Sequence, residues 1–172
     1  DKYNIALVLN ALGQLAVGQG LVQEATDHFD EALSLFRDLH DSLNTANVLK
    51  SEGDLKFFLG QADEARAYYE EALEIFLHSA FRGNVADILQ RLGNVALLQG
   101  LLQEARHLYE DALNAFQQLE QWHGVAVTQV SLGNLFLTLG EVEEANRSLE
   151  EALTVFRRLE DLDKIATTLD LL

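Results

Sequence analysis

The sequence predicts an all-α fold, an α-solenoid built from four helical hairpins and the start of a fifth. The first observation is a period, because the 172-residue chain repeats itself every 40 residues. Ala6, Gly13, Gly20 and Phe36 each recur at the same place in the next three units. The second observation is that a glycine divides every unit into two amphipathic segments. A period of this length indicates stacked supersecondary units, in which the core grows with each added unit.

The units are expected at 1–40, 41–80, 81–120 and 121–160, with a partial fifth at 161–172, and to form a single array over 1–172. In the first unit, apolar residues recur every three or four positions over 5–16 and again over 22–39, which is one face of a helix. Units two to four repeat both segments. Each unit is therefore predicted to be a helix, a tight turn and a second, longer helix.

Two glycines mark the geometry of each hairpin. Gly20 and its equivalents stand where the first helix must stop, and glycine adopts the left-handed conformation there without steric cost. Gly13 lies inside the first helix, where glycine costs about 1 kcal/mol relative to alanine. Four such glycines in register predict that the second helix approaches closely there, with Phe29 and Phe36 filling the space between turns.

The pattern resembles the tetratricopeptide repeat. The third unit carries the elements of that repeat as Leu92-Gly93, Gly100, Glu104-Ala105, Tyr109 and Ala112. Two departures occur, because Leu149 replaces the aromatic residue in unit four and Glu52 replaces the leucine before glycine in unit two. Eight positions are identical in all four units, so the match is far more specific than a short motif.

The resemblance implies a right-handed solenoid in which the first helices line the concave face. The family's usual unit is about 34 residues, so the six extra residues are expected to lengthen the second helix. Arrays with a 40-residue period are similar to those of bacterial signalling regulators, caspase-like bacterial proteins and animal spindle-orientation adaptors. All of these are interaction modules, which implies a non-catalytic scaffold that binds a peptide or protein segment in its groove.

The implied groove residues are those at unit positions 7, 10, 14 and 17, which share one helical face. Position 14 is polar and position 17 is apolar in every unit, which suits the backbone and side chains of an extended peptide. The alternative, left open by the sequence, is that position 14 is merely exposed and position 17 packs internally. Besides Leu7, the predicted partner-binding residues are Asn10, Gln14, Val17, Asn47, Lys50, Asp54, Phe57, Asp87, Gln90, Asn94, Leu97, Val127, Val130, Asn134 and Leu137.

The net charge of −16 belongs mainly to the second helices, whose halves of the units sum to −14 against −2 for the rest. This distribution predicts a solvated acidic outer surface. A nucleic-acid partner is not expected, because Lys50 is the only cation among the predicted groove residues. No run of 18 apolar residues is present, so no membrane partner is expected, and a cytoplasmic location fits.

An enzyme is not expected. The five histidines form no pair at i and i+4, no zinc or phosphate-loop motif occurs, and cysteine is absent, so no cofactor or metal site is predicted. Acidic pairs such as Glu70-Glu71 recur with the helix and indicate a charged face. Phe81 and Trp122 stand near the starts of units and are expected to cap the packing between units, with an exposed contact patch as the alternative.

A second functional hypothesis is self-association, or coupling between domains of a larger bacterial signalling regulator. The partial fifth unit ends without a polar capping helix, and repeat arrays need capped ends for solubility. End-to-end contact through the termini, or a longer parent chain, is therefore expected under this hypothesis.

Overall fold

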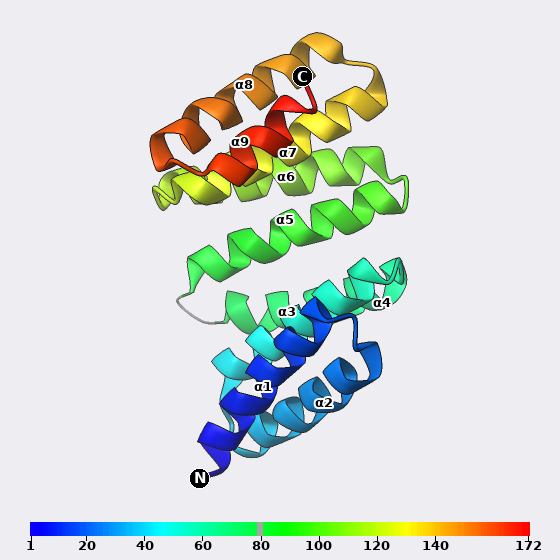
Figure 1. The fold of residues 1–172 in the computed structure, drawn as a ribbon, viewed down its shortest axis with the longest axis vertical. Helices are drawn as coiled ribbons and strands as arrows, with labels where there is room; N and C mark the ends of the chain where they lie inside the picture. The colour runs from blue at the N-terminus through cyan, green and yellow to red at the C-terminus, as the bar shows by residue number, and fades with distance from the viewer. Residues whose placement is uncertain (79–80) are drawn as a thin grey trace. The chain divides into compact units, whose positions relative to one another are not determined.

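The computed structural model describes residues 1–78 and 81–172, and in this part of the chain every regular element is an α-helix (Figure 1). The helices fall into two compact units, Asp1–Ala80 and Phe81–Leu172. The all-α, helical-repeat fold predicted from the 40-residue period is confirmed. That the units form one continuous array stays a prediction.

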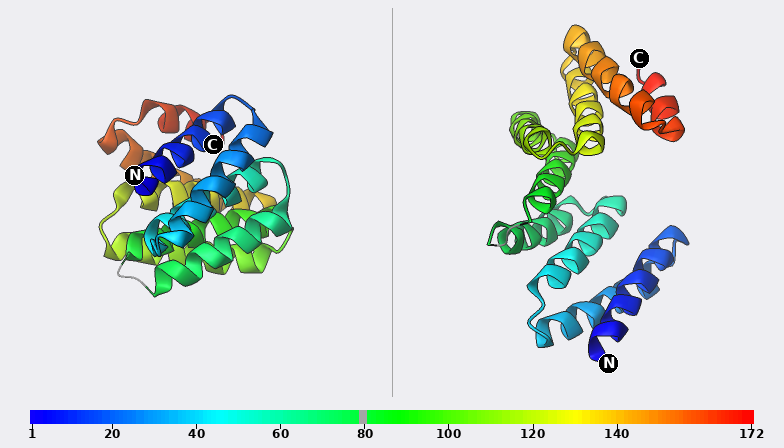
Figure 2. Two further views of the ribbon diagram at one scale, coloured as in Figure 1. Left: turned by 90° about the horizontal axis from the view of Figure 1, so that it is seen from below. Right: turned by 90° about the vertical axis from the view of Figure 1, so that its left-hand side faces the viewer.

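The first compact unit holds two hairpins. Its helices are α1 (Lys2–Gly18), α2 (Val22–Asp38), α3 (Ser42–Phe58) and α4 (Ala62–Leu77). Helix α1 packs on α2 and α3 packs on α4, while α2 also contacts α3, so the two hairpins share one core (Figure 2).

The second compact unit holds two further hairpins and one short helix. Its helices are α5 (Arg82–Leu98), α6 (Leu102–Gln118), α7 (Trp122–Leu139), α8 (Val142–Leu159) and α9 (Leu162–Leu169). Helix α5 packs on α6 and α7 on α8, while α6 covers α7 and α8 contacts α9. Helix α5 also touches α7 directly, so these two first helices lie side by side.

The prediction that the second helix of each hairpin is longer is wrong. Helices α1, α2 and α3 each have 17 residues, and α7 and α8 each have 18. The first helices begin at the second residue of their 40-residue units, earlier than their apolar periodicity indicates. In three cases an aspartate caps that start, since Asp1, Asp41 and Asp161 accept hydrogen bonds from backbone amides of the first turn. The added residues therefore do not belong to the second helix alone.

Replacing Asp41 tests whether its side chain stabilises the start of α3. Its Oδ1 atom accepts from the amide of Asn44 at 3.0 Å, and its Oδ2 atom accepts from the Asn44 side chain at 2.7 Å. We expect Asp41→Ala to lower the unfolding free energy of the first compact unit by ~1 kcal/mol, because an amide donor at the helix start is left without its acceptor. Urea unfolding followed by circular dichroism measures this. Asp41→Asn keeps the acceptor and is expected to match the wild type, so an equal loss in both variants would contradict the capping role.

The turn glycines adopt the predicted left-handed conformation, with φ between 73° and 76° at Gly20, Gly60, Gly100 and Gly140. The sequence did not reveal that the connection between hairpins uses the same geometry without glycine. His40, Glu120 and Glu160 have φ of 54° to 56°. In both kinds of turn an amide just beyond the helix donates to a carbonyl of its last turn, as Leu21 does to Ala16 and Asp41 to Phe36, both at 2.9 Å.

The close approach predicted at Gly13 is confirmed in all four hairpins. A Cβ atom built on Gly13 would lie 2.5 Å from the Phe29 ring, and one on Gly53 would lie 2.5 Å from the Tyr69 ring. The same clash would occur between Gly93 and Tyr109 at 2.5 Å, and between Gly133 and Leu149 at 2.8 Å. Glycine here lets a large side chain of the second helix, an aromatic ring in three hairpins and Leu149 in the fourth, sit against the backbone of the first helix.

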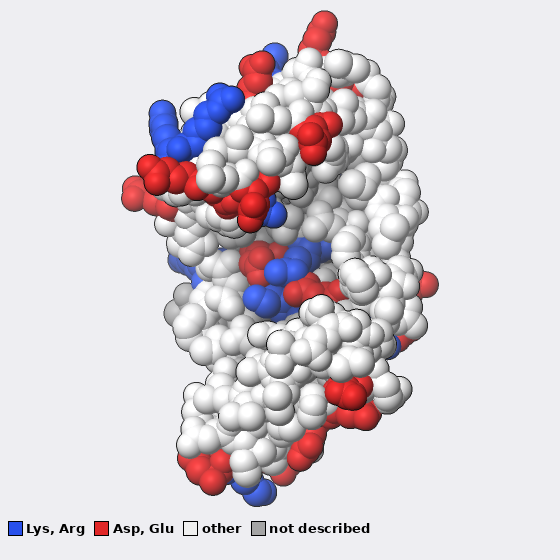
Figure 3. Space-filling view, in the orientation of Figure 1, with Lys and Arg blue, Asp and Glu red and all other residues white. Residues whose placement is uncertain are grey.

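The acidic residues of the second helices are mostly exposed, as expected for a solvated surface, and Figure 3 shows Asp and Glu side chains spread over both compact units. That Phe81 and Trp122 cap the packing between repeats stays a prediction. The Phe81 side chain is 45% exposed, and Trp122, the first residue of α7, is 52% exposed.

Among the described residues, no helix is both long and apolar enough to cross a membrane.

Candidate functional site

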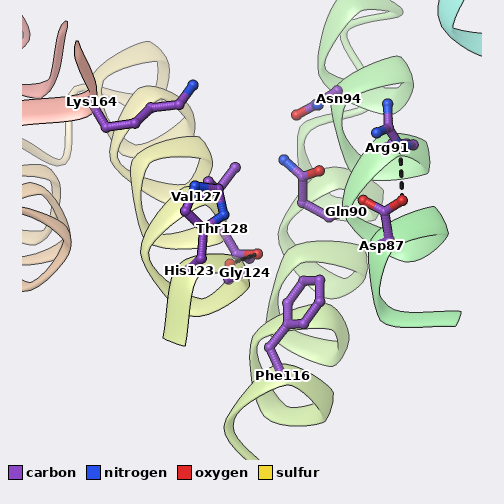
Figure 4. Close-up of a pocket in the computed structure, with 10 residues that line it drawn as sticks. All are labelled: Asp87, Gln90, Arg91, Asn94, Phe116, His123, Gly124, Val127, Thr128 and Lys164. Atoms are coloured by element: carbon purple, nitrogen blue, oxygen red, sulfur yellow. Dashed lines mark hydrogen bonds and ion pairs between the residues drawn. The ribbon is translucent and has the colours of Figure 1, made fainter. Parts of the chain in front are cut away.

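Four of the eight predicted groove residues of the second compact unit meet in a pocket between α5 and α7. The pocket has a volume of about 360 Å³. Asp87, Gln90 and Asn94 line it from α5 and Val127 lines it from α7 (Figure 4). These four residues lie up to 40 positions apart in the sequence, and the side-by-side packing of α5 and α7 brings them together. The remaining predicted residues of these helices, Leu97, Val130, Asn134 and Leu137, do not line this pocket.

Two amides of the pocket are held in place by hydrogen bonds. The Gln90 side chain is buried, and its Nε2 donates to Ser131 Oγ of α7 at 3.1 Å. Asn94 Oδ1 accepts from the Tyr109 hydroxyl of α6 at 2.8 Å and from Ser131 Oγ at 3.5 Å. Burial raises the pKa of the Tyr109 phenol, so this hydroxyl stays protonated as a donor at neutral pH. In each side-chain amide, a hydrogen bond at one of its two polar atoms fixes the orientation of the group.

The other ends of both amides point to no protein partner in the part of the chain that the structure describes. These atoms are Asn94 Nδ2, a donor, and Gln90 Oε1, an acceptor. They stand one helical turn apart on the same face of α5. The pair therefore offers one donor and one acceptor to a ligand.

Charged side chains surround these amides. Arg91 Nε lies 3.3 Å from Asp87 Oδ2 in an ion pair at the edge of the pocket (Figure 4). Lys164 extends over the pocket from α9, and no ion pair joins it to another described side chain. His123 Nε2 stands 3.5 Å from Asp161 Oδ2. The expectation that Lys50 is the only groove cation is wrong, because Arg91 and Lys164 also line this pocket.

A second hollow continues the pocket along α5 and α7. It has a volume of about 480 Å³ and shares four lining residues with the first, Asp87, Phe116, His123 and Gly124. Trp122 and Gln121 line its far part. The two hollows form one elongated depression, which we call the α5–α7 groove. Its floor is apolar at Phe116 and polar along α5.

In the first compact unit, the predicted residues lie on α1 and α3 and several serve internal contacts. Gln14 Nε2 donates to Ser51 Oγ at 3.2 Å and so joins the two hairpins. Asp54 Oδ1 accepts from the Tyr69 hydroxyl at 2.6 Å. Asn10 is half-buried, and its Oδ1 has no hydrogen-bond partner. Val17, Asn47, Lys50 and Phe57 are also half-buried.

These contacts explain why position 14 is polar in two of the units. Where the second helix carries a tyrosine at position 29, as at Tyr69 and Tyr109, position 14 is an Asp or Asn that accepts its hydroxyl. The pairing of these residue types could have been noticed in the sequence. A polar position of the predicted groove thus also has an internal role.

The sequence and the fold agree with one family of repeats. The tetratricopeptide repeat model matches residues 4–78 and 84–158. The chain belongs to the tetratricopeptide repeat family. A comparison with curated proteins gives no match.

Solved structures with tetratricopeptide-like folds are similar over nearly the whole chain. BtubC (BKLC) from P. vanneervenii is 22% identical with a TM-score of 0.78, over 98% of this chain and 78% of that protein. Aspartyl phosphate phosphatase F from Bacillus subtilis is 11% identical with a TM-score of 0.92, over 99% of this chain and 45% of that one. The Rap conjugation gene regulator of plasmid pLS20, in complex with the Phr* peptide, is 20% identical with a TM-score of 0.87, over 98% and 46%. The chain spans less than half the length of the last two proteins.

The tetratricopeptide repeat pattern led to Asp87, Gln90, Asn94 and Val127 but missed other residues of the pocket. Arg91 is adjacent to the predicted face, and its long side chain reaches around the helix. His123 and Lys164 come from the starts of α7 and α9, where the repeat pattern has no fixed residue. No group of three or more His, Cys, Asp or Glu that could hold a metal ion occurs within residues 1–78 and 81–172.

Proposed function

We propose that this tetratricopeptide repeat chain is a non-catalytic scaffold that binds an extended peptide segment in the α5–α7 groove. The observation that carries the proposal is the meeting of Gln90 and Asn94 in one pocket, each with an amide end that has no described partner. A peptide backbone presents alternating N–H and C=O groups, which match Gln90 Oε1 and Asn94 Nδ2.

The surroundings of the two amides favour a peptide over a small polar ligand. The groove is elongated, and its floor at Phe116 and Val127 offers apolar contact to side chains that point into it. Lys164 stands over the pocket and favours a carbonyl or carboxylate of the segment. The fold relative from plasmid pLS20 was solved with the Phr* peptide, which supports this ligand class.

The variant Asn94→Asp tests the proposal, because a carboxylate retains the acceptor for Tyr109 and loses the Nδ2 donor. Asp54 accepts the Tyr69 hydroxyl in this way, so the variant is expected to fold normally. Binding peptides are selected on the wild-type chain from a displayed library of random linear heptapeptides. We expect Asn94→Asp to weaken them about tenfold in calorimetry, the loss of one well-placed hydrogen bond in a desolvated site.

Asn134→Asp is the matched control, because Asn134 occupies the same unit position and does not line the pocket. Its peptide affinities are expected to equal those of the wild type. Equal weakening in both variants, or selected peptides that ignore Asn94→Asp, would overturn the groove as the binding site. A selection without binders, together with concentration-dependent sedimentation, would instead favour the self-association hypothesis.

A further inference from the structure

A further hollow lies next to the α5–α7 groove, between the start of α7 and the end of α8. It has a volume of about 290 Å³ and is lined by Trp122, Val155, Arg158 and Leu159. Trp122 is the first residue of α7 and Leu159 is the last residue of α8, and these two helices pack together as one hairpin. We call this hollow the Trp122 pocket. None of its four residues belongs to the predicted groove residues.

Trp122 joins this pocket to the α5–α7 groove. The residue also lines the far part of the groove, together with Gln121 and Gly83. The next residue, His123, packs its ring edge-on against Phe156 of α8, with the two ring centroids 6.0 Å apart. This contact holds the start of α7 on α8, and the half-exposed Trp122 side chain borders both hollows. A segment that lies along the groove therefore reaches the Trp122 pocket by crossing one side chain.

The first hairpin shows which interaction occupies the same place there. Lys2 and Asp38 stand at the unit positions of Trp122 and Arg158, and Lys2 Nζ lies 4.0 Å from Asp38 Oδ2. In the fourth hairpin an indole and a guanidinium replace this ion pair. The indole offers an apolar face to another ring, and the guanidinium offers charge-assisted hydrogen bonds to an anion. This place has thus changed from an ion pair to a combination of groups suited to a ligand.

The exposure of the Trp122 pocket is a property of its unit positions. Leu159 is 46% exposed, and Leu39, at the same unit position, is 39% exposed although α3 packs on α2. Gln118, at the unit position of Arg158, is exposed although α7 packs on α6. A following hairpin therefore leaves these positions open to solvent.

We propose that the Trp122 pocket is a second subsite for the peptide in the α5–α7 groove, and that it takes an aromatic side chain next to a carboxylate. The inference rests on the proposed function, because it concerns the same bound segment. Trp122, Val155 and Leu159 supply apolar contact for the aromatic ring, which also gains from stacking on the indole. Arg158 lies in the last turn of α8 and pairs with a neighbouring carboxylate of the segment.

The sequences of the selected heptapeptides are the first measurement. The library omits tryptophan, so that Trp122, the only tryptophan of the chain, reports its own surroundings. We expect the binders to share a Phe or Tyr with an Asp or Glu beside it, and to shift the Trp122 emission to shorter wavelength. Replacing the aromatic residue of such a peptide by alanine is expected to weaken binding by at least about tenfold.

Two adjacent arginines provide a variant and its matched control. Arg158→Gln is expected to weaken the selected peptides about fivefold, and to have no further effect on a peptide whose acidic residue is replaced by its amide. Arg157→Gln removes the same charge from the neighbouring residue, which does not line the pocket, and is expected to leave the affinity unchanged. Both side chains are exposed, so the folded chain tolerates either change.

Different results would overturn the two proposals. Peptides that are weakened by Asn94→Asp but respond equally to Arg157→Gln and Arg158→Gln would retain the groove and overturn the Trp122 pocket. Binders without a shared aromatic residue, or binders that leave the Trp122 emission unchanged, would also overturn the pocket alone. Peptides that respond to Arg158→Gln and ignore Asn94→Asp would overturn the groove and, with it, the role of the pocket as its subsite. A selection without binders would overturn both.

Discussion

Glu52→Leu is expected to stabilise the first compact unit by about 1–4 kcal/mol, a range found when buried ion pairs are replaced by apolar residues of similar volume. Glu52 stands at the unit position that is leucine at Leu12, Leu92 and Leu132. Its side chain is only 2% exposed, and its Oε1 atom is buried without a hydrogen-bond partner. The carboxyl therefore occupies a core position, where one of its two oxygens lacks the hydrogen bond that a buried polar atom needs.

The same residue makes stability depend on pH. Burial raises the pKa of Glu52 above its ordinary value of 4.5, although a hydrogen bond from Tyr68 acts in the opposite direction. Because the folded pKa is the higher one, the unfolded chain releases its proton first as the pH rises from about 4.5. The destabilisation by Glu52 is absent in acid, grows through the folded pKa, and is complete above it.

Hydrogen exchange of α3 amides, measured by mass spectrometry across the pH range, checks both the stabilisation by Glu52→Leu and its dependence on pH. Glu52→Leu should slow the exchange, and its gain over the wild type should grow with pH above 4.5. Glu52→Gln is the matched control, since it removes the charge and keeps the polar shape, so its own difference from the wild type should show the same rise. A gain that is constant with pH would contradict the assignment of the effect to ionisation.

Gly93→Ala is expected to lower the unfolding free energy of the second compact unit by about 2 kcal/mol. In an ordinary helix the change would stabilise by about 1 kcal/mol, because alanine has the higher helix propensity. Here the new Cβ atom would lie 2.5 Å from Cε1 and 2.6 Å from Cδ1 of Tyr109, a fully buried ring. Overpacking of this kind costs about 1–3 kcal/mol. A shift of the ring also weakens the 2.8 Å hydrogen bond from Tyr109 to Asn94.

Urea unfolding followed by Trp122 fluorescence measures this loss, because Trp122 is the only tryptophan and lies in the same unit. Gly18→Ala is the matched control, and its unfolding is followed by circular dichroism because Gly18 lies in the first compact unit. It also lies in a first helix, and its added Cβ would meet nothing within 4 Å. Gly18→Ala should therefore stabilise slightly. If Gly93→Ala were also stabilising, close packing would not be the reason for the repeated glycine.

The 40-residue repeat predicts only part of the candidate site. Position 14 was identified in every unit as a polar groove position, and in the second compact unit Asn94 indeed lines a pocket. The same pattern could not show that Asn94 accepts the Tyr109 hydroxyl from 15 residues away. Nor could it supply Lys164, because that residue reaches the pocket from α9, whose place beside α8 is a matter of tertiary packing.

The sequence by itself determined the hairpins, the left-handed glycine at Gly20 and the close approach at Gly13. These features depend on residues near one another in the chain, and the same residues recur in all four 40-residue units. Only the tertiary structure decided the equal helix lengths, the left-handed His40, the burial of Glu52 and the composition of the α5–α7 groove. These depend on which side chains meet across helices that are distant in sequence, and the spacing of residues along one helix does not contain that information.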